Sequence, residues 1–327
     1  MKILIIRFSS IGDIVLTTPV MRCLKNQLGA TVHYLTKKQN KSLVEHNPNI
    51  DKIHVLEDSG LLQLIEILRQ EKYDHIIDLH HNIRTALIKF CLFRPSHTFA
   101  KLNFQKWLMV NFKKGGPCQH IVDRYLETCS HLGVKNDGKG LDFFWDKTKE
   151  RYFNQQLDNL CLVPFNYTVL AIGAAHFTKR IPLVKLKELV TVLSGKILII
   201  GGKDELSIAN ELMELKNPNL ISGVGKLSLD GSAFVISKAS KVVSPDTGMM
   251  HIAAAFQKPI ISVWGSTVPE FGMTPYYATK TEKKNSVVEV QGLSCRPCSK
   301  IGFSSCPKGH FKCMNDIDFQ AFFSQTN

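Results

Sequence analysis

The segment from residue 241 to residue 267 reads KVVSPDTGMMHIAAAFQKPIISVWGST, and it decides the expected fold. Lys241–Ser244 (KVVS) and Pro259–Trp264 (PIISVW) are short apolar runs, and each predicts a buried strand. Met249–Phe256 lies between them and predicts a helix. A strand–helix–strand unit with continuous apolar strands is typical of a parallel sheet that is covered by helices on both faces.

The same rhythm occurs on both sides of the middle of the chain, and it predicts an α/β protein with two doubly wound, Rossmann-like domains. We expect the polar stretch Asn154–Asn166 to link the two domains. In the first half the predicted strands are Lys2–Arg7, Thr31–Leu35, Ile53–Leu56 and Asp74–Leu79, and the helices are Ile14–Leu28 and Leu61–Gln70. In the second half the further strands are Tyr167–Gly173, Lys196–Gly201 and Asn219–Ser222, and the helices are Leu183–Leu193, Asp204–Leu215 and Ser228–Ala239.

The composition excludes wholesale disorder. Of the 327 residues, 44% are hydrophobic and 21% are charged, which are ordinary values for a globular protein. No window approaches the ~18 apolar residues that a membrane span requires. The apolar start Ile3–Ile6 is too short for the core of a signal peptide, because Arg7 interrupts it. We therefore expect a cytoplasmic protein.

The formal net charge is +13, and one stretch of the chain is strongly basic. Between Asp78 and Asp123 there is no acidic residue, whereas Lys, Arg and His are frequent. A field of one sign concentrates anionic partners near it. Nucleic acid, acidic lipid headgroups and phosphorylated sugars are the candidate partners at this point, and a solvated basic surface is the plain alternative.

A polar motif, Arg7-Phe8-Ser9-Ser10-Ile11-Gly12-Asp13, follows the first predicted strand directly. Ligands of doubly wound sheets bind beyond the carboxyl ends of the strands, which is where this motif falls. Asp13 has three potential roles there: it stabilises the helix N-terminus, binds a ligand hydroxyl, or acts as a general base. The motif lacks GxxxxGK[ST] and GxGxxG, which argues against P-loop kinases and nucleotide-dependent dehydrogenases.

Three further motifs follow strands of the second half. Asp246, Thr247, Gly248 and His251 surround the start of a helix, whose free N–H groups suit an anion. Lys179 stands in the loop from Gly173 to Pro182, where small residues and cations suit a phosphate. Glu205 follows Gly201-Gly202 and suits the hydroxyls of a ribose. The structural alternatives are capped helices and a solvated basic loop.

Four of the nine cysteines cluster near the C-terminus, at Cys295, Cys298, Cys306 and Cys313. Four thiols within one segment suit a tetrahedral zinc ion, but only one pair has the CxxC spacing that zinc ribbons use twice. Disulfides are disfavoured in a reducing cytoplasm. A structural zinc site and free thiols therefore both stay open.

Together these motifs resemble glycosyltransferase family 9, the heptosyltransferases of lipopolysaccharide core synthesis. The likeness rests on RFSSIGDIVLTTP near the N-terminus and on SPDTGMMHIAAAFQKPIISVWGST, with AIGAAHFTKRIP, GGKDE, YDHIIDLHHNIRTALI and HIVDRYL in the expected order. The resemblance implies a GT-B fold of two Rossmann-like domains that face an interdomain cleft. Residues 1–155 would bind the acceptor and carry the catalytic base, and residues 156–327 would bind the donor and contain the cysteine-rich segment 295–313.

The resemblance also implies an activity: inverting transfer of a heptose-like sugar from ADP-heptose to a lipopolysaccharide inner-core acceptor, with no cofactor required. Asp13 would be the catalytic base. The implied donor contacts are Lys179, Glu205, Asp246, Thr247, Gly248 and His251, and the implied acceptor contacts are Ser10, Arg84 and Arg124.

The basic stretch would then meet an anionic acceptor and dock on the cytoplasmic face of the inner membrane. Two rivals remain: a family 9 transferase for another sugar or acceptor, and a non-catalytic protein that binds nucleic acid or another anion. Because no nucleic-acid-binding motif is recognisable, we expect no nucleic-acid partner.

Overall fold

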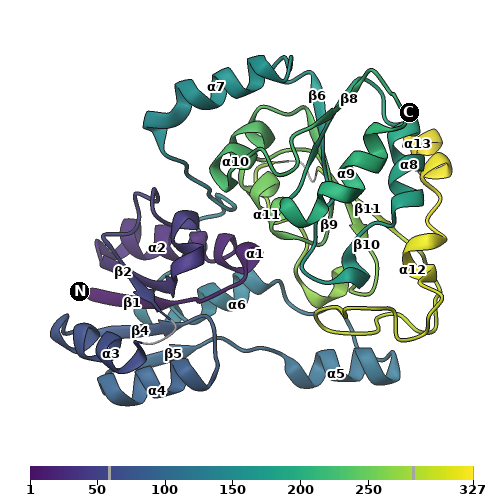
Figure 1. Ribbon diagram of the computed structural model, residues 1–327. Coiled ribbons are helices and arrows are strands. Elements are labelled where there is room, and N and C mark those ends of the chain that lie inside the picture. Colours follow the sequence, from purple (N-terminus) through teal and green to yellow (C-terminus); the bar gives the residue numbers. More distant parts are fainter. Residues whose placement is uncertain (58–59, 282–283, 327) are drawn as a thin grey trace. The chain divides into compact units, whose positions relative to one another are not determined.

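The computed structural model describes residues 1–57, 60–281 and 284–326 (Figure 1). The chain forms two compact units. The first unit comprises residues 1–102, 119–145 and 276–280, and the second comprises residues 103–118, 146–275 and 281–327. Each unit is built around one parallel sheet, as the strand–helix rhythm predicts.

The sheet of the first unit has the strand order β3-β2-β1-β4-β5, and every neighbouring pair is parallel. Strand β1 is central, and Ile3, Leu4, Ile5 and Ile6 are completely buried because helices cover both faces. The strands are β1 (Lys2–Ile6), β2 (Thr31–Lys37), β3 (Lys52–Leu56), β4 (His75–Asp78) and β5 (Ser96–Thr98).

Helices α3 and α4 pack against one face of this sheet, where Leu64 and Ile88 share a buried core with Leu4. The predicted single helix Ile14–Leu28 is in fact two helices, α1 and α2, which part around Leu16 and Thr17. Pro19 lies near the start of α2, where its missing N–H costs no hydrogen bond. The helical segments of the unit are α1 (Ile11–Val15), α2 (Thr18–Leu28), η1 (Lys38–Leu43), α3 (Leu61–Gln70), α4 (Ile83–Leu92), α6 (Ile121–Glu127) and η2 (Ser130–Leu132).

The sheet of the second unit has the order β11-β10-β9-β6-β7-β8 and is also parallel throughout. The segment 241–267 forms β9, α11 and β10 as predicted. The strands are β6 (Tyr167–Ala171), β7 (Lys196–Ile200), β8 (Leu220–Ser222), β9 (Lys241–Pro245), β10 (Ile260–Trp264) and β11 (Asn285–Glu289).

Helices cover both faces of the second sheet (Figure 1). Helices α8, α9 and α13 contribute to one core, and α7, α10 and α11 pack together elsewhere in the unit. The helical segments are α5 (Asn103–Phe112), η3 (Lys147–Lys149), α7 (Glu150–Asn159), η4 (Phe177–Lys179), α8 (Leu183–Val192), η5 (Lys203–Glu205), α9 (Leu206–Met213), α10 (Leu229–Ser237), α11 (Gly248–Ala255), η6 (Pro269–Phe271), α12 (Lys312–Asn315) and α13 (Phe319–Thr326).

Helix α7 occupies the first part of the stretch that the sequence predicts as a linker, residues 154–159. Phe153 and Leu157 are buried, and the Phe153 ring lies 5.5 Å from the Phe234 ring of α10. This polar, Asn-containing segment is therefore an amphipathic helix that packs on its own unit. The predicted division after residue 155 falls inside α7. The chain passes between the two units at 145/146 and also at 102/103, 118/119, 275/276 and 280/281, so neither unit is one continuous segment.

Each sheet reverses its strand order once, and these reversals locate the expected ligand sites. In the first unit the reversal lies between β1 and β4, and in the second it lies between β6 and β9. Doubly wound sheets bind ligands outside the carboxyl ends of the strands at such switch points. Among the described residues, no helix combines the length and apolar character that crossing a bilayer requires.

Candidate functional site

Asp13 lies in the first turn of α1, just beyond the carboxyl end of β1. Its Oδ2 atom accepts hydrogen bonds from the Ser10 backbone N–H at 3.1 Å and from the Ser10 hydroxyl at 2.8 Å. The same oxygen lies 2.9 Å from Nη2 of Arg7. The carboxylate is thus fixed by three donors while 19% of its side chain remains exposed. It is oriented and accessible, as a general base must be.

Arg7 is the anchor of this arrangement, and the sequence motif alone gave it no role. It is 8% exposed, and its guanidinium donates to the Ser9 carbonyl at 2.7 Å and to the Tyr125 hydroxyl at 2.9 Å. It also donates to the Leu79 carbonyl at the end of β4. One buried guanidinium therefore joins the ends of β1 and β4 and positions Asp13. A cation directly after a buried strand was the signal for it.

The end of β4 brings a histidine to the same place. Asp78 is fully buried, and its Oδ1 accepts the backbone N–H groups of His80 at 3.0 Å and His81 at 2.8 Å. Burial, together with the positive charge of Arg7, lowers the pKa of His80 to about 4. The imidazole of His80 is therefore neutral at physiological pH.

The three predicted acceptor contacts have different surroundings. Ser10 is exposed and bonded to Asp13. Arg84 is exposed in the first turn of α4. Arg124 is 1% exposed, and it donates to the backbone carbonyls of Gln119 at 3.1 Å and Ala100 at 2.9 Å. Arg124 thus holds two chain segments together, and an acceptor role for it stays a prediction.

In the second unit, Lys179 and Asp246 form an ion pair at the switch point between β6 and β9. Lys179 ends η4 after β6, Asp246 follows β9, and Nζ of Lys179 lies 2.6 Å from Oδ2 of Asp246. That oxygen also accepts the Thr267 hydroxyl at 2.9 Å. Thr267 follows β10 in the WGST segment, and no role was predicted for it. Its place directly after a strand was the available signal.

Helix α11 begins beside this ion pair. Thr247 is its N-cap and accepts the Met249 N–H at 3.3 Å, while Gly248 is the first helical residue. His251 lies one turn further along and is 2% exposed. The N-terminal end of α11 presents backbone N–H groups next to a lysine, which is a suitable environment for phosphate oxygens.

Glu205 is held firmly at the end of β7. Its Oε2 accepts the Gly202 N–H at 2.8 Å, and its Oε1 lies 3.7 Å from Nη2 of Arg180. A Cβ atom at Gly173 would lie 3.0 Å from the Glu205 carboxyl carbon. A side chain at position 173 would therefore push the Glu205 carboxylate away by a few tenths of an ångström. Six predicted donor contacts therefore gather at the carboxyl ends of β6, β7 and β9.

The cysteine-rich segment packs against the loop that carries Lys179. Thr178 is buried, and its hydroxyl accepts the Phe303 N–H at 2.8 Å and the Ser266 hydroxyl at 2.9 Å. Arg296 donates to the Thr267 carbonyl at 3.0 Å and pairs with Glu289. Segment 295–303 therefore supports both the Lys179 loop and the Thr267 loop.

The four clustered cysteines are free thiols, and Cys313 is buried. Burial, followed by the charges of the other thiols, raises the pKa of Cys298 and raises that of Cys313 to about 12. Cys295 Sγ lies 4.0 Å from Nε2 of His310. The donor set is chemically suited to zinc. However, the described groups with three ligating atoms within 4.8 Å of one another contain histidines of the first unit instead.

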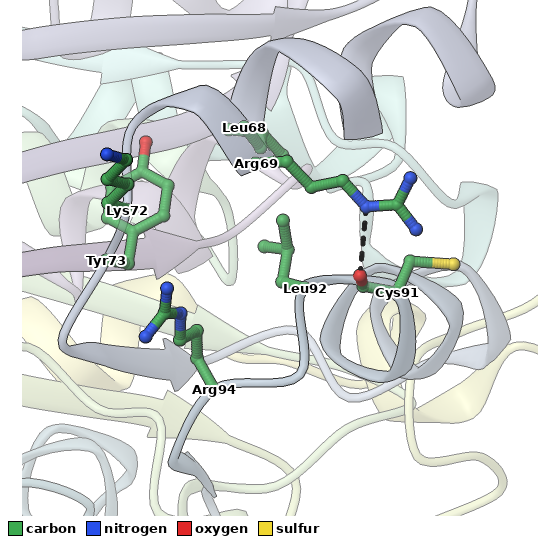
Figure 2. Close-up of a pocket in the computed structure, with 7 residues that line it drawn as sticks. All are labelled: Leu68, Arg69, Lys72, Tyr73, Cys91, Leu92 and Arg94. Atoms are coloured by element: carbon green, nitrogen blue, oxygen red, sulfur yellow. Dashed lines mark hydrogen bonds between the residues drawn. The ribbon is translucent and has the colours of Figure 1, made fainter.

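A pocket of about 280 Å³ lies elsewhere in the first unit, between the ends of α3 and α4 (Figure 2). Arg69, Lys72 and Arg94 line it, and Arg69 donates to the Cys91 carbonyl at 3.1 Å. Its walls come from the turn before β4, whereas Asp13 follows the carboxyl end of β1. The pocket is therefore distinct from the candidate site.

Comparison with known proteins gives one consistent result. Residues 61–304 match the family model of glycosyltransferase family 9 (heptosyltransferase). Lipopolysaccharide heptosyltransferase 1 of Campylobacter coli is 25% identical over 294 residues, which cover 82% of this chain and 84% of the relative.

Solved structures share the fold. The glycosyltransferase family 9 protein of Veillonella parvula superposes with a TM-score of 0.73 at 22% identity, covering 88% of this chain and 85% of that one. Escherichia coli heptosyltransferase WaaC, solved with ADP-2-deoxy-2-fluoro heptose, gives a TM-score of 0.68 at 21% identity over all of both chains. The two Rossmann-like units thus form a GT-B fold. Because the family model matches most of the chain, and because the strand ends carry the motifs described above, the protein belongs to glycosyltransferase family 9.

Proposed function

We propose that the protein is an inverting heptosyltransferase, which moves heptose from ADP-heptose to a hydroxyl of a lipopolysaccharide inner-core acceptor. The observation that carries the proposal is that reactive and phosphate-binding side chains lie at the switch points of both sheets in a family 9 chain. Asp13, oriented by Arg7, lies in the first turn of α1, just beyond the central strand β1, and the Lys179–Asp246 pair lies beside the N-terminus of α11. The names of the relatives support heptose as the sugar.

In the proposed reaction, Asp13 accepts the proton of the acceptor hydroxyl as that oxygen attacks the anomeric carbon. The new bond forms on the face opposite the leaving group, so the configuration inverts. The bond between the anomeric carbon and the phosphate oxygen breaks, and its electron pair leaves with ADP. Lys179 and the N–H groups of α11 stabilise the charge that develops on the diphosphate.

Lys179 has to change partner when the donor binds. Its ammonium is 16% exposed and already contacts the Asp246 carboxylate at 2.6 Å. A diphosphate carries more negative charge than one carboxylate, so it competes successfully for a partly buried ammonium. Thr267 then keeps Asp246 hydrogen-bonded, because its hydroxyl donates to the same carboxylate. Glu205 is our proposed partner for the ribose hydroxyls, and His251 and Gly248 for the sugar and diphosphate.

We propose that the transfer needs no metal ion, because cationic side chains and helix N–H groups take the charge of the leaving diphosphate. The cysteine cluster is at most structural in this view. Turnover in excess EDTA should equal turnover in buffer alone. A loss of turnover that added Mg²⁺ or Mn²⁺ restores would contradict this part of the proposal.

We further propose that the enzyme works in the cytoplasm at the membrane surface, and that α5 makes the contact. This helix exposes Phe104 (71%), Trp107 (46%) and Phe112 (56%), while its Lys106 is buried. Phe104 and Trp107 stack with centroids 6.1 Å apart. Exposed aromatic rings favour the headgroup region of a bilayer. The adjoining Lys114 adds a cation.

Vesicle sedimentation tests the membrane contact. Phosphatidylglycerol-containing vesicles should pellet the protein, and Trp107→Ala should reduce the bound fraction. Tyr152→Ala is the matched control, because Tyr152 is an exposed aromatic residue of the same unit on α7. Equal binding by both variants would rule out α5 as the contact.

A nucleotide panel tests the proposed donor. ADP, UDP, GDP and CMP are compared in a thermal-shift assay, followed by ADP-heptose. A ligand at 100 times its Kd adds about 2.7 kcal/mol of stability, so the correct nucleotide raises Tm measurably. We expect a shift selective for ADP and larger for ADP-heptose. Selectivity for another nucleotide would reassign the donor within the family.

A further inference from the structure

Three histidines of the first unit converge at a place that the proposed reaction does not use. They are His75 at the start of β4, His97 in β5 and His131 in η2. Each offers one ring nitrogen, and these nitrogens all lie within 4.8 Å of one another. The rings of His97 and His131 stack with centroids 3.4 Å apart, and the His75 ring lies 5.6 Å from that of His131.

The topology of the sheet explains this convergence. Strand β5 is an edge strand paired with β4, and His97 lies opposite Ile77 in the register. Side chains alternate along a strand, so His75 and Ile77 point to the same face. Ile76 points to the other face, into the core shared with α3 and α4. The segment after α6 brings His131 over the two strands. The cluster thus lies at the amino end of β4, whereas Asp13 and His80 lie at the carboxyl end of the sheet.

The chemistry of the three rings suits a metal ion. Nδ1 of His75 is buried and has no hydrogen-bond partner in the described part of the chain. A buried polar atom without a partner costs about 1–3 kcal/mol, so this ring has unmet hydrogen-bonding capacity beside the other two. His131 also makes a hydrogen bond to the backbone of Thr128, a contact that fixes the orientation of its ring.

A second group of the same unit, formed by His33, His54 and Glu71, provides a contrast. Its polar atoms already satisfy one another: His33 Nδ1, His54 Nε2 and the Tyr73 hydroxyl lie 3.0–3.2 Å apart. Glu71 is neutralised by Lys2 and Lys52. A cation would meet two ammonium groups there and would have to break a closed hydrogen-bond network. Within the described ranges, no ion pair with an ammonium group and no closed hydrogen-bond network involves His75, His97 or His131.

We propose that His75, His97 and His131 form a binding site for a divalent late transition-metal ion of the Zn²⁺ class, with water completing the coordination. Imidazole nitrogen is a preferred ligand of such ions, and three histidines with an open position are a known zinc arrangement. Two nitrogens on one tetrahedral zinc lie roughly 3.3 Å apart. The exposed ring of His131 therefore has to leave the stack and rotate inward by a small distance. The bound ion would fasten β5 and η2 to β4.

Titration with Zn²⁺ tests the proposal on the whole chain after removal of metal by chelation. The titration is carried out in the Cys295→Ser/Cys298→Ser variant, in which the four-thiol cluster cannot form and compete for the ion. We expect one equivalent bound and a rise in Tm. His131→Ala should weaken the Kd at least ~10-fold, because loss of a ligand exceeds the effect of an outer-shell change. His46→Ala, in the same unit but outside the cluster, is the matched control and should leave the Kd unchanged.

Co²⁺ as a second probe identifies the ligands directly. Cobalt bound by imidazoles gives visible d–d bands without the intense near-ultraviolet band of a thiolate complex. His97→Ala provides a second variant, and the Tm of each metal-free variant shows whether it is folded. Two results would overturn the proposal: no Zn²⁺ binding by the cysteine double variant, or equal affinity in the His131→Ala, His97→Ala and His46→Ala variants.

Discussion

The position of Asp13 narrows the roles that the sequence allows for it. The sequence is compatible with a helix-stabilising residue, a ligand contact or a general base. The structure shows that the first role is real, because Asp13 accepts the N–H of the N-cap residue Ser10. It also shows a buried arginine on the same oxygen. Helix stabilisation alone does not require that arginine, so the geometry favours a carboxylate that is held for chemistry.

Lys179 gives a prediction at this scale. Replacing it with alanine removes the cation that we expect on the donor diphosphate. A hydrogen bond to a charged group is worth about 1.5–3 kcal/mol, so kcat/KM for ADP-heptose should fall by roughly 10- to 100-fold. Steady-state kinetics with varied donor would measure this fall. Lys226→Ala is the control, because Lys226 is an exposed lysine of the same unit.

Lys179→Ala also leaves Asp246 without its cation, but the Thr267 hydroxyl still donates to that carboxylate. The variant should therefore stay folded, with a Tm close to that of the wild type. If its kcat/KM matched that of Lys226→Ala, the assignment of Lys179 to the diphosphate would be wrong.

At the scale of elements, most strands and helices were predictable because the apolar pattern of each segment and the residues at its ends indicate the same structure. The strands β1, β6, β7, β9 and β10 are apolar runs bounded by glycine, proline or polar residues, and all five occur close to the predicted bounds. The break between α1 and α2 is marked in the sequence by Pro19 alone, which a helix tolerates in its first turn, so the segment predicts one helix instead of two. The sequence of α7 predicts a linker because few of its residues are apolar, and only Phe153 and Leu157 are buried.

The cysteine-rich segment gives a prediction about an element. Gly302 has a φ of +108°, and a Cβ atom there would lie 2.7 Å from Cβ of His176 in the Lys179 loop. Gly302→Ala should cost about 1–3 kcal/mol of stability, from backbone strain alone, and more from the clash. Thermal unfolding measures the cost.

Gly309→Ala is the matched control for this prediction. Gly309 also has a positive φ, +73°, but nothing lies within 4 Å of its added Cβ. The difference between the two variants reports the contact with His176 together with the added strain of the larger φ at residue 302. Equal Tm values for the two variants would mean that the cysteine-rich segment does not pack tightly against His176 in the Lys179 loop.

At the scale of the molecule, the sequence predicted the two doubly wound sheets and the gathering of motifs at strand ends. Parallel topology places the residues that follow several strands at one edge of the sheet. The proximity of Lys179, Glu205 and Asp246 was therefore predictable from the strand pattern. Contacts between side chains that do not lie at the carboxyl ends of strands were not predictable from the sequence. The histidines of β4, β5 and η2 belong to this second class, because no spacing or motif relates them.

Global stability should fall in acid before the carboxylates titrate. His54 is 5% exposed, and burial, together with the nearby His33, lowers its pKa from 6.5 to about 4. The unfolded chain therefore binds a proton that the folded chain refuses between these two values. Binding of this proton stabilises the unfolded state as the pH falls from 6.5 towards 4. The free energy of unfolding therefore decreases by an amount on the order of 3 kcal/mol.

Denaturant unfolding at several pH values checks this prediction. The free energy of unfolding should decrease from pH 7 to pH 4, and His54→Leu should flatten that decrease, whatever its effect on stability at pH 7. An equally steep decrease in His54→Leu would show that other groups cause it.

The central claim assigns different parts of one reaction to the two units, and one variant tests it most directly. Asp13→Asn keeps the shape of the side chain but removes the base. Transfer of heptose from ADP-heptose to an inner-core acceptor should fall by about 10²- to 10⁴-fold, the usual contribution of a general base. The Kd for ADP-heptose, measured by calorimetry, should stay unchanged, and Glu57→Gln in the same unit should keep full turnover. Near-normal turnover by Asp13→Asn would contradict the account.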